Sequence, residues 1–457
     1  MNRIATRALI MLVLVLLLAG GLVFFLGDYL ANADDWILFP GSPHVYNGNK
    51  VSAGTIVDRD DVLLLDQTGN RIYSTEELLR RSSLHWVGDR PGNIRAVYVD
   101  HYATELMGFD SFNGVYTYGV ASPQIQLTIS AQLQNAALAA MGKRIGTVAV
   151  YNYKTGELLC AVTTPTFDPE SPPDISGDDT GAYQGVYLNR FTQSKYIPGS
   201  IFKIVTLATA LETVSGVQDI TFECTGKYEI GAGDVTCEDN HGKQTLKEAF
   251  CNSCNCAFAQ IVGMVGRETL HRYVELFGVT QPVTFDGITT VSGNFEVEGA
   301  SDALVAWSGI GQHKDQVNPC AFLSFVGAIA NDGVMVTPHV VDSVSAGSAQ
   351  TYSAEAESRG RIMSSTTAKI LQEYMGNNVQ TKYGAENFPG LSVCAKSGTG
   401  EVGGEKKPNA MFTGFISDSN YPLAFIAVVE DGGYGTYISM PIVSQVLGAC
   451  KNYLDNQ

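Results

Sequence analysis

Basic residues are scarce in this chain of 457 residues, because only 29 lysines and arginines stand against 46 aspartates and glutamates. The resulting net charge of −17 excludes a nucleic-acid partner, which would require a basic face. Charged residues of both signs make up only 16% of the sequence, whereas apolar residues make up 45%. Such a composition supports a large buried core and excludes a disordered chain.

Long apolar runs are equally scarce, and residues 8–26, rich in Leu and Val, are the only long apolar stretch without a charge. Its length matches the roughly 20 residues that cross a bilayer as a helix. Arg3 and Arg7 precede it and aspartates follow it, so everything after about residue 27 is expected outside the cytoplasm. Although Ala31-Asn32-Ala33 resembles a signal-peptide cleavage site, the run exceeds a signal core of roughly 7–15 residues. We therefore favour an uncleaved, single-pass anchor in the cell membrane.

No repeat or low-complexity segment is visible, and the length suits one large domain plus a smaller one. We expect residues 1–33 to form a cytoplasmic tail and transmembrane anchor. Residues 34–121 are predicted to form a small pedestal domain, with strands at 55–58 and 62–65 around a turn. A change in composition at Ser122-Pro123 starts the larger domain, residues 122–457.

The larger domain is predicted to be α/β, in the α+β sense, with helices flanking a central antiparallel sheet. Helix signals occur at 128–141, where Thr128 or Ser130 would be the cap, at 200–212 and at 441–454. Strand signals occur at 146–151, 157–163, 411–416 and 423–429. Because strands lie near both ends of this domain, we expect them to meet in one sheet.

The first of three short polar motifs, residues 200–203, follows the chain-breaking pair Pro198-Gly199. A helix starting there places the Ser200 hydroxyl and the Lys203 amine on one face, with the helix dipole favouring an oxyanion. Lys203 can act as a base only if its pKa falls towards neutrality, which burial and a second cation, Lys396, would cause. Taken alone, this pattern more often marks a capping serine and a surface lysine.

The second motif is Ser253-Cys254-Asn255. Its serine can pass a proton to a leaving amine, and its asparagine can bind substrate or hold Lys203. Ser292-Gly293-Asn294 has the same pattern, but we interpret it as a turn because its surroundings are Gly-rich. A helix signal at 256–265 favours the first copy.

The third motif, Lys396-Ser397-Gly398-Thr399, precedes an apolar strand pair and is predicted to be an edge strand. Its lysine and serine can bind a substrate carboxylate, and its glycine allows a substrate backbone to approach. The amides of Ser200 and Thr399 could form an oxyanion hole. Each motif alone is weak, but the three in this order behind an export anchor outline a serine acyltransferase that works without histidine.

Nine cysteines leave at least one thiol unpaired. Cys224 and Cys237 flank a short Gly-rich segment and could close a disulfide loop. Three further cysteines lie within residues 251–256, a spacing that suggests metal, but no second pair completes a tetrahedral set. His241 is the only candidate for a fourth ligand. We therefore favour thiols without metal.

Beyond the motifs, the chain resembles the class B penicillin-binding proteins, the monofunctional peptidoglycan D,D-transpeptidases. The similarity covers about residues 122–457, fainter traces lie at 52–61 and 81–89, and the short pedestal resembles that of the compact Gram-positive members. Besides the motifs, it rests on residues 127–129, 154–157, 166–169, 196–200, 311–312 and 330–333. Ala53-Gly54 stands where the family usually has Arg-Gly, and Ser397 stands where many relatives have threonine.

The resemblance implies a penicillin-binding, serine-β-lactamase-like fold and a two-step reaction. The nucleophile would attack the penultimate D-Ala carbonyl of a stem peptide, and an amine of a neighbouring stem would then form the cross-link. β-Lactams would acylate the same serine, no metal or organic cofactor would be needed, and a membrane glycan polymerase would be a partner. The implied roles are nucleophile, base and proton shuttle for Ser200, Lys203 and Ser253, substrate positioning for Asn255, and carboxylate binding by Lys396, Ser397, Gly398 and Thr399.

Four other functions use part of the same set of motifs. A bifunctional class A protein would need roughly two hundred more residues before the motifs. A β-lactamase would need an activated water, and no Glu-x-x-Leu-Asn segment lies between the second and third motifs. A D,D-carboxypeptidase, which uses the same residues with water as acceptor, stays open. A catalytically idle β-lactam sensor or scaffold is disfavoured by the intact motifs.

Overall fold

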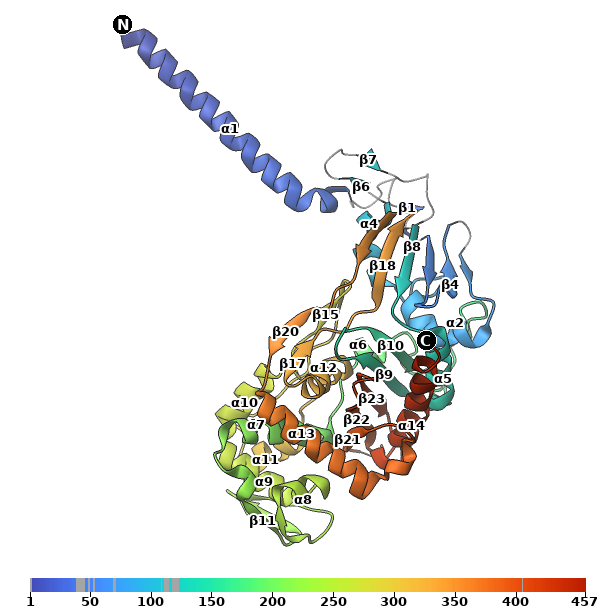
Figure 1. The fold of residues 1–457 in the computed structure, drawn as a ribbon, viewed down its shortest axis with the longest axis vertical. Helices are drawn as coiled ribbons and strands as arrows, with labels where there is room; N and C mark the ends of the chain where they lie inside the picture. Colours follow the sequence, from blue (N-terminus) through green and yellow to red (C-terminus); the bar gives the residue numbers. More distant parts are fainter. Residues whose placement is uncertain are drawn as a thin grey trace.

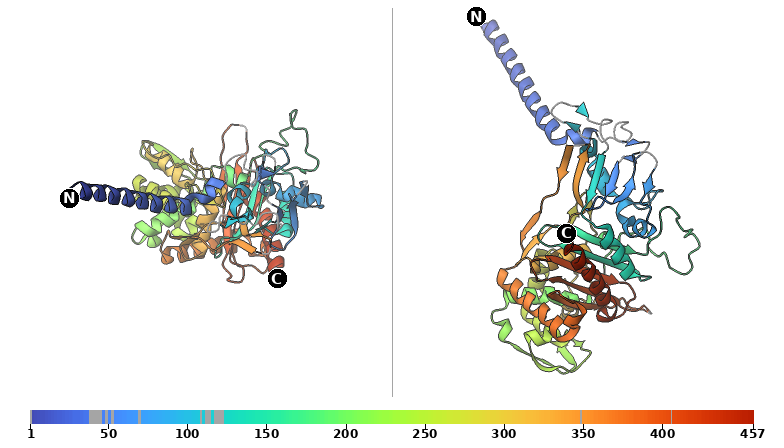
Figure 2. Two further views of the ribbon diagram at one scale, coloured as in Figure 1. Left: turned by 90° about the horizontal axis from the view of Figure 1, so that it is seen from above. Right: turned by 45° about the vertical axis from the view of Figure 1, so that its right-hand side comes forward.

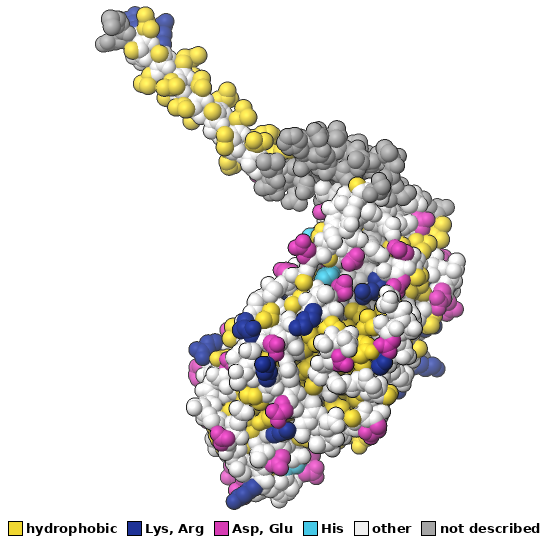
Figure 3. Space-filling view, in the orientation of Figure 1, with side chains coloured by type: hydrophobic (Ala, Val, Ile, Leu, Met, Phe, Trp, Pro, Cys, Tyr) yellow, Lys and Arg dark blue, Asp and Glu magenta, His cyan; other side chains and the backbone are white. Residues whose placement is uncertain are grey.

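The computed structural model describes residues 2–37, 46–47, 50–51, 54–68, 71–107, 109–110, 115–116, 123–347, 349–404 and 406–457. A single long helix, α1 (Asn2–Ile37), extends away from the body of the protein (Figure 1). Hydrophobic side chains cover its visible face, with basic side chains near its outer end (Figure 3). Its segment Arg3–Tyr29 is long and apolar enough to cross a membrane. The expected apolar helix is thus confirmed, and it is longer than the uncharged run.

The central sheet has five antiparallel strands in the order β10-β9-β23-β22-β21. Except in the strand that carries the third motif, their sequences are nearly continuous apolar runs, as expected for strands buried on both faces. The prediction that both ends of the larger domain meet in one sheet is confirmed, as is the edge position of the third motif. The strands are β9 (Gly146–Asn152), β10 (Leu158–Thr164), β21 (Val393–Gly400), β22 (Asn409–Ile416) and β23 (Leu423–Val429).

Helices α5 (Ala131–Met141) and α14 (Gly435–Leu454) contact each other and pack on one face of this sheet (Figure 2). Of the two predicted cap residues of α5, Ser130 is confirmed, but its side chain makes no capping hydrogen bond. The Asp58 carboxylate accepts the Ala131 N–H at 2.7 Å instead. Helix α14 begins six residues before the predicted start. The prediction placed Pro441 at the start of the helix, whereas this proline lies inside it. The helical turn that contains Ser439 is attached to the sheet, because the Ser439 hydroxyl donates to the Ala410 carbonyl at 2.8 Å.

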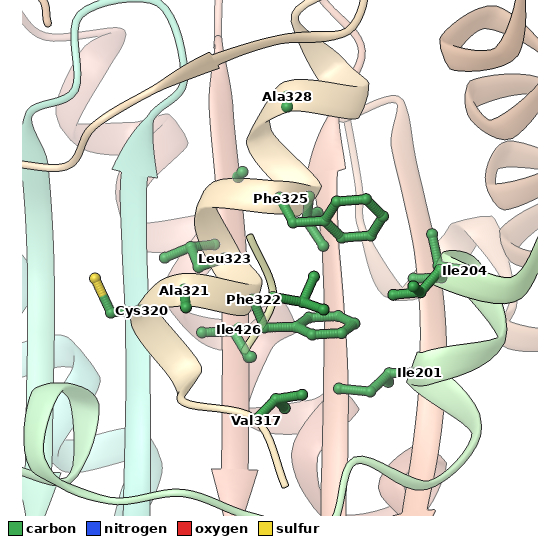
Figure 4. Packing of buried hydrophobic residues seen from close by; sticks show 14 of the residues in the cluster. Ile201, Ile204, Val317, Cys320, Ala321, Phe322, Leu323, Phe325, Ala328 and Ile426 are labelled. Carbon is green, nitrogen blue, oxygen red and sulfur yellow. The ribbon is translucent and has the colours of Figure 1, made fainter. Parts of the chain in front are cut away.

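Helix α12 (Pro319–Ala330) contacts β22 and β23 and packs beside the helix start that carries the first motif, which itself contacts β21 (Figure 4). Figure 4 shows Phe322 and Phe325 of α12 directed toward Ile201 and Ile204. The predicted helix from residue 200 is in fact a 3₁₀ turn, η1 (Gly199–Phe202), followed by α7 (Lys203–Thr213). Apolar packing thus fixes the first motif against the core.

A helical region with two small hairpins follows the first motif. Its helices are α8 (Leu246–Cys251), α9 (Asn255–Val265), α10 (Arg267–Leu276), α11 (Asp302–Ile310) and α13 (Ser365–Asn378). The hairpins pair β11 (Thr221–Cys224) with β14 (Gly242–Thr245) and β12 (Lys227–Ile230) with β13 (Gly233–Thr236).

A second sheet has six strands in the order β19-β18-β8-β3-β4-β5 and lies on the α1 side of the body (Figure 1). It combines segments from both sides of the predicted domain boundary, and residues 121 and 122 lie outside the described residues. The division into pedestal and larger domain therefore stays a prediction. The strands are β3 (Thr55–Val57), β4 (Leu63–Asp66), β5 (Ile72–Tyr73), β8 (Pro123–Leu127), β18 (Val341–Ala346) and β19 (Ala349–Ser353).

A two-pronged ion pair joins α2 (Glu77–Val87) to the loop after β10. The Arg80 guanidinium donates to both carboxylate oxygens of Asp168, at 2.7 and 2.6 Å. The remaining short elements are β1 (Tyr46–Asn47), β2 (Lys50–Val51), α3 (Val97–His101), α4 (Ala103–Met107), β6 (Phe109–Asp110), β7 (Val115–Tyr116), α6 (Arg190–Gln193), η2 (Val217–Asp219), β15 (Thr284–Phe285), β16 (Ile288–Thr289), β17 (Val334–Val336), β20 (Ser358–Arg361), the π-helix η3 (Val379–Tyr383) and η4 (Ala385–Asn387).

Candidate active site

The three sequence motifs meet in one site, and the first two of them surround a single nitrogen atom, Nζ of Lys203. This atom lies 3.1 Å from Oγ of Ser200 and 3.2 Å from Oγ of Ser253. Oδ1 of Asn255 lies 2.7 Å from it. From strand β21, Nζ of Lys396 reaches Oγ of Ser253 at 3.0 Å. A helix start, a loop and an edge strand therefore line a single site, as the sequence predicted.

Ser200 lies at a helix start that packs closely against β21. Gly199 before it has a φ of 55°, and a Cβ there would lie 2.2 Å from the carbonyl oxygen of Thr399. Only glycine fits this backbone and this contact. The Gly199 N–H donates to the Gly311 carbonyl at 2.7 Å, which fixes the turn from a second side. The half-buried Ser200 side chain is thereby held at the junction of helix and strand.

Ser253 lies between α8 and α9 in an unusual backbone conformation. Its φ is 55°, a region that few non-glycine residues adopt and that concentrates at functional sites. This conformation brings its carbonyl oxygen within 2.5 Å of Nζ of Lys203 as well as its hydroxyl. Asn255, the first residue of α9, is held from behind because its Nδ2 donates to the Thr236 carbonyl at 2.9 Å.

A neutral amine can satisfy the four oxygens around Nζ of Lys203. Two of them, the Ser253 carbonyl and Oδ1 of Asn255, can only accept hydrogen bonds. The other two are the hydroxyls of Ser200 and Ser253. An ammonium group has three hydrogens and no lone pair, whereas a neutral amine donates two hydrogen bonds and accepts one. A neutral Lys203 can therefore satisfy both carbonyl oxygens and accept the proton of the Ser200 hydroxyl.

Burial supports the same protonation state. Lys203 is fully buried, and the loss of water lowers its pKa to about 7. Cys237, Cys254 and Glu238 raise this pKa by less than burial lowers it, and the nearby Lys382 lowers it further. Burial, and then the like charges of Lys203 and Lys382, lower the pKa of Lys396 well below its usual value. Burial, more than the second amine, thus makes a neutral lysine available near physiological pH.

Strand β21 forms one wall of the site. The Ser397 N–H points away from β22, because it donates to the hydroxyl of Tyr383 at 2.9 Å. Since strand geometry repeats every two residues, the Thr399 N–H points to the same side. A Cβ on Gly398 would lie 2.7 Å from the carbonyl oxygen of Pro198, so the wall approaches the Ser200 turn closely at this residue. Strand β21 therefore directs the N–H groups of Ser397 and Thr399 away from β22, on the side where the first motif lies.

Two residues that brace this wall carried no role in the sequence analysis. Burial raises the pKa of Tyr383 to about 12, and its hydroxyl lies 3.0 Å from Oγ of Ser397. Nε2 of Gln312 donates to the Thr399 carbonyl at 3.0 Å. The Gly311-Gln312 pair was a mark of the family resemblance, whereas no local pattern singles out Tyr383. Only the packing of η3 beside β21 brings Tyr383 to the site.

The cysteines are free thiols in the described part of the chain, so the Cys224–Cys237 disulfide that the sequence left open is not formed. Both thiols instead lie 3.6 Å from Nδ1 of His241, which sits beside them. Sγ of Cys251, from the 251–256 cluster, lies 3.0 Å from Oγ1 of Thr381 and away from this group.

Comparisons with known proteins agree with this geometry. The penicillin binding protein transpeptidase domain matches residues 146–448, more than half of the chain. The peptidoglycan D,D-transpeptidase PbpA of Mycolicibacterium smegmatis is 27% identical over 68% of this chain and 67% of its own length. Stage V sporulation protein D of Bacillus subtilis is 29% identical over 66% of this chain and 48% of its own length.

Solved structures share the fold. The D,D-transpeptidase domain of a peptidoglycan glycosyltransferase from Eggerthella lenta has a TM-score of 0.76 at 26% identity, covering 89% of this chain and 99% of that one. Penicillin-binding protein A of M. tuberculosis, as its ceftriaxone acyl-enzyme complex, has a TM-score of 0.74 at 21% identity, covering 87% and 98%. Together with the convergent motifs, these matches show that the chain belongs to the penicillin-binding protein transpeptidase family, as a class B member.

Proposed function

We propose that this protein is a peptidoglycan D,D-transpeptidase that carries the acyl group of a stem peptide on Ser200. The observation that carries the proposal is the buried amine of Lys203, which lies within hydrogen-bond distance of both motif hydroxyls. A lysine kept neutral by burial can take the proton of a serine without a histidine.

In the first step, Oγ of Ser200 attacks the penultimate D-Ala carbonyl carbon, and its proton passes to Nζ of Lys203. The amides of Ser200 and Thr399 stabilise the developing oxyanion, each being worth about 2.7–4 kcal/mol. The proton then passes through the Ser253 hydroxyl to the nitrogen of the leaving D-Ala. Collapse of the intermediate breaks the peptide bond and leaves an ester on Ser200.

In the second step, the amine of a neighbouring stem attacks this ester, and the protons move in the reverse direction. A peptide bond forms between the stems, and the Ser200 hydroxyl is restored. A β-lactam would follow the first step, but its cleaved amide stays attached and blocks the second.

Substrate orientation would depend on the second and third motifs. The amide of Asn255 positions the stem peptide beside Lys203. The hydroxyls of Ser397 and Thr399 bind the terminal carboxylate, and this anion would favour the charged form of Lys396 against the lowering of its pKa by burial. Gly398 leaves room for the peptide backbone. The exposed Lys382 adds positive charge at this end of the site.

Helix α1 would anchor the protein as an uncleaved single span with the catalytic region outside the cytoplasm. The arginines before the apolar segment support this orientation, since basic residues stay on the cytoplasmic side. A membrane-embedded polymerase that supplies fresh glycan strands is the proposed partner. The membrane anchor and the polymerase partner are both carried over from the resemblance to class B proteins.

Labelling with a fluorescent penicillin tests the nucleophile. The full-length protein in detergent should be marked covalently, and Ser200→Ala should not be marked. Removing the third-motif cation, Lys396→Ala, should slow labelling, because the β-lactam carboxylate loses its counter-charge. Labelling of Ser200→Ala at the wild-type rate would place the nucleophile elsewhere.

Product analysis with lipid-linked substrate and an active polymerase tests the acceptor. Dimeric muropeptides would identify cross-linking. Trimmed monomers without dimers would identify a D,D-carboxypeptidase, with water replacing the amine in the second step. Labelling by penicillin with neither product would identify a sensor or scaffold.

A further inference from the structure

Four side chains that could bind a metal come together directly behind the second motif. Cys224 is the last residue of β11, Cys237 follows β13, His241 precedes β14, and Cys254 lies between Ser253 and Asn255. Their ligating atoms all lie within 4.8 Å of one another. The two hairpins and the motif loop, distant in sequence, thus converge on one point.

The distances match those between ligands of one tetrahedral ion. Nδ1 of His241 lies 3.6 Å from Sγ of both Cys224 and Cys237, and Sγ of Cys237 lies 3.9 Å from Sγ of Cys254. Tetrahedral zinc, with bonds of about 2.3 Å to sulfur and 2.0 Å to nitrogen, separates its ligands by about 3.5–3.8 Å. A disulfide would require sulfurs about 2.05 Å apart.

Burial and ligand type favour a closed, structural site. Cys224 and Cys254 are buried, whereas Cys237 and His241 are partly exposed, which leaves a path for an ion from solvent. Three thiolates and an imidazole form a Cys₃His set, which selects zinc over the harder divalent ions. The Ala257 N–H donates to Sγ of Cys254 at 3.4 Å, an outer contact typical of thiolate ligands.

We propose that Cys224, Cys237, His241 and Cys254 bind a structural Zn²⁺ that holds the second motif in its catalytic conformation. Zinc bonds to three thiolate sulfurs and to Nδ1 of a neutral His241, and the three thiol protons are released to solvent. No position stays open for water or substrate, so the ion takes no part in acyl transfer. This role lies outside the proposed transpeptidase reaction.

The connection to the catalytic groups is short. Cys254 is covalently joined to Ser253, whose φ of 55° presents both its oxygens to Lys203. Asn255, the residue after Cys254, donates to the carbonyl of Thr236, the residue before Cys237. An ion bound to Cys254 and Cys237 therefore holds both partners of this hydrogen bond, which orients the second motif. Without it, we expect the Ser253 loop to relax and acylation to slow.

Metal analysis of the full-length protein, purified in detergent with reductant and then dialysed against zinc-free buffer, tests the site. The wild type should retain about one Zn²⁺ per chain. Cys224→Ser, Cys237→Ser and His241→Ala should lose it. The matched control is Cys251→Ser, which removes a thiol close in sequence that contacts Thr381 instead and should keep the ion.

A second measurement does not depend on the variants folding. Chelation of wild-type zinc should lower the Tm and the rate of penicillin labelling, and added Zn²⁺ should restore both. Substitution by Co²⁺ should give the visible absorption of a tetrahedral thiolate complex. Because Ser200→Ala should keep its zinc while losing its label, this proposal and the transpeptidase proposal can fail separately.

Three results would overturn the zinc site. One is wild-type protein that neither retains nor takes up Zn²⁺. Another is peptide mapping that finds Cys224 and Cys237 joined as a disulfide in protein isolated without reductant. The third is equal zinc content in His241→Ala and the wild type.

Discussion

The neutral amine of Lys203 predicts a specific pH profile for acylation. Its usual pKa of 10.5 is lowered to about 7 by burial. At pH 7 about one lysine in 3,000 of ordinary pKa is neutral, whereas about half of Lys203 would be neutral. Burial therefore raises the active fraction by about three orders of magnitude. Below pH 7 the rate constant for acylation by a penicillin should fall about tenfold per pH unit, and above pH 8 it should reach a plateau.

The assay is stopped-flow or quenched labelling with a fluorescent penicillin between about pH 5 and pH 9, within which the inflection should fall. Lys382→Met is the informative variant, because removing this like charge should move the inflection to higher pH. Lys143→Met, at an exposed lysine after α5, is the matched control and should leave the profile unchanged. A flat profile, or a rate that still climbs towards the ordinary lysine pKa, would refute the assignment of Lys203 as the base.

Three further perturbations test the surroundings of the site. Tyr383→Phe leaves the Ser397 N–H without its acceptor and should slow acylation about tenfold, measured by the same labelling. Gly199→Ala should abolish labelling and lower the Tm, because its Cβ would lie 2.2 Å from a carbonyl oxygen of β21; a wild-type Tm would contradict this. Arg80→Ala should cost about 1–3 kcal/mol of unfolding free energy in a denaturant titration, because its pair with Asp168 is largely buried. Since Arg80 lowers the pKa of Asp168, this difference should be fully present above about pH 4 and shrink on acidification through the folded pKa.

Much of the catalytic centre could be predicted because its signals are local. The hydroxyl and amine of the first motif are one helical turn apart, and apolar runs bounded by turn residues mark β9, β10, β22 and β23. The order of the motifs then implied that they converge. The structure alone reveals that four oxygens surround the amine of Lys203 once the motifs converge.

The features that could not be predicted depend on contacts between distant segments. Asp58 caps α5 from 73 residues away, so no local capping pattern reveals it. Tyr383 reaches the third motif only because a π-helical turn packs beside β21. The cysteine spacing pointed to residues 251–256, but of these only Cys254 joins the group that Cys224, Cys237 and His241 form.

The six-stranded sheet also limits how this protein can be shortened for crystallisation or inhibitor screening. Strand β8 pairs with β18 on one edge and with β3 on the other, in parallel. A soluble version that began at residue 123 would strip β3, β4 and β5 from β8 and expose an unpaired edge, which is a template for aggregation. It would also remove Asp58, the carboxylate that closes the start of α5. Useful soluble versions should therefore begin between the apolar segment of α1 and Gly54, and not at the sequence-predicted boundary.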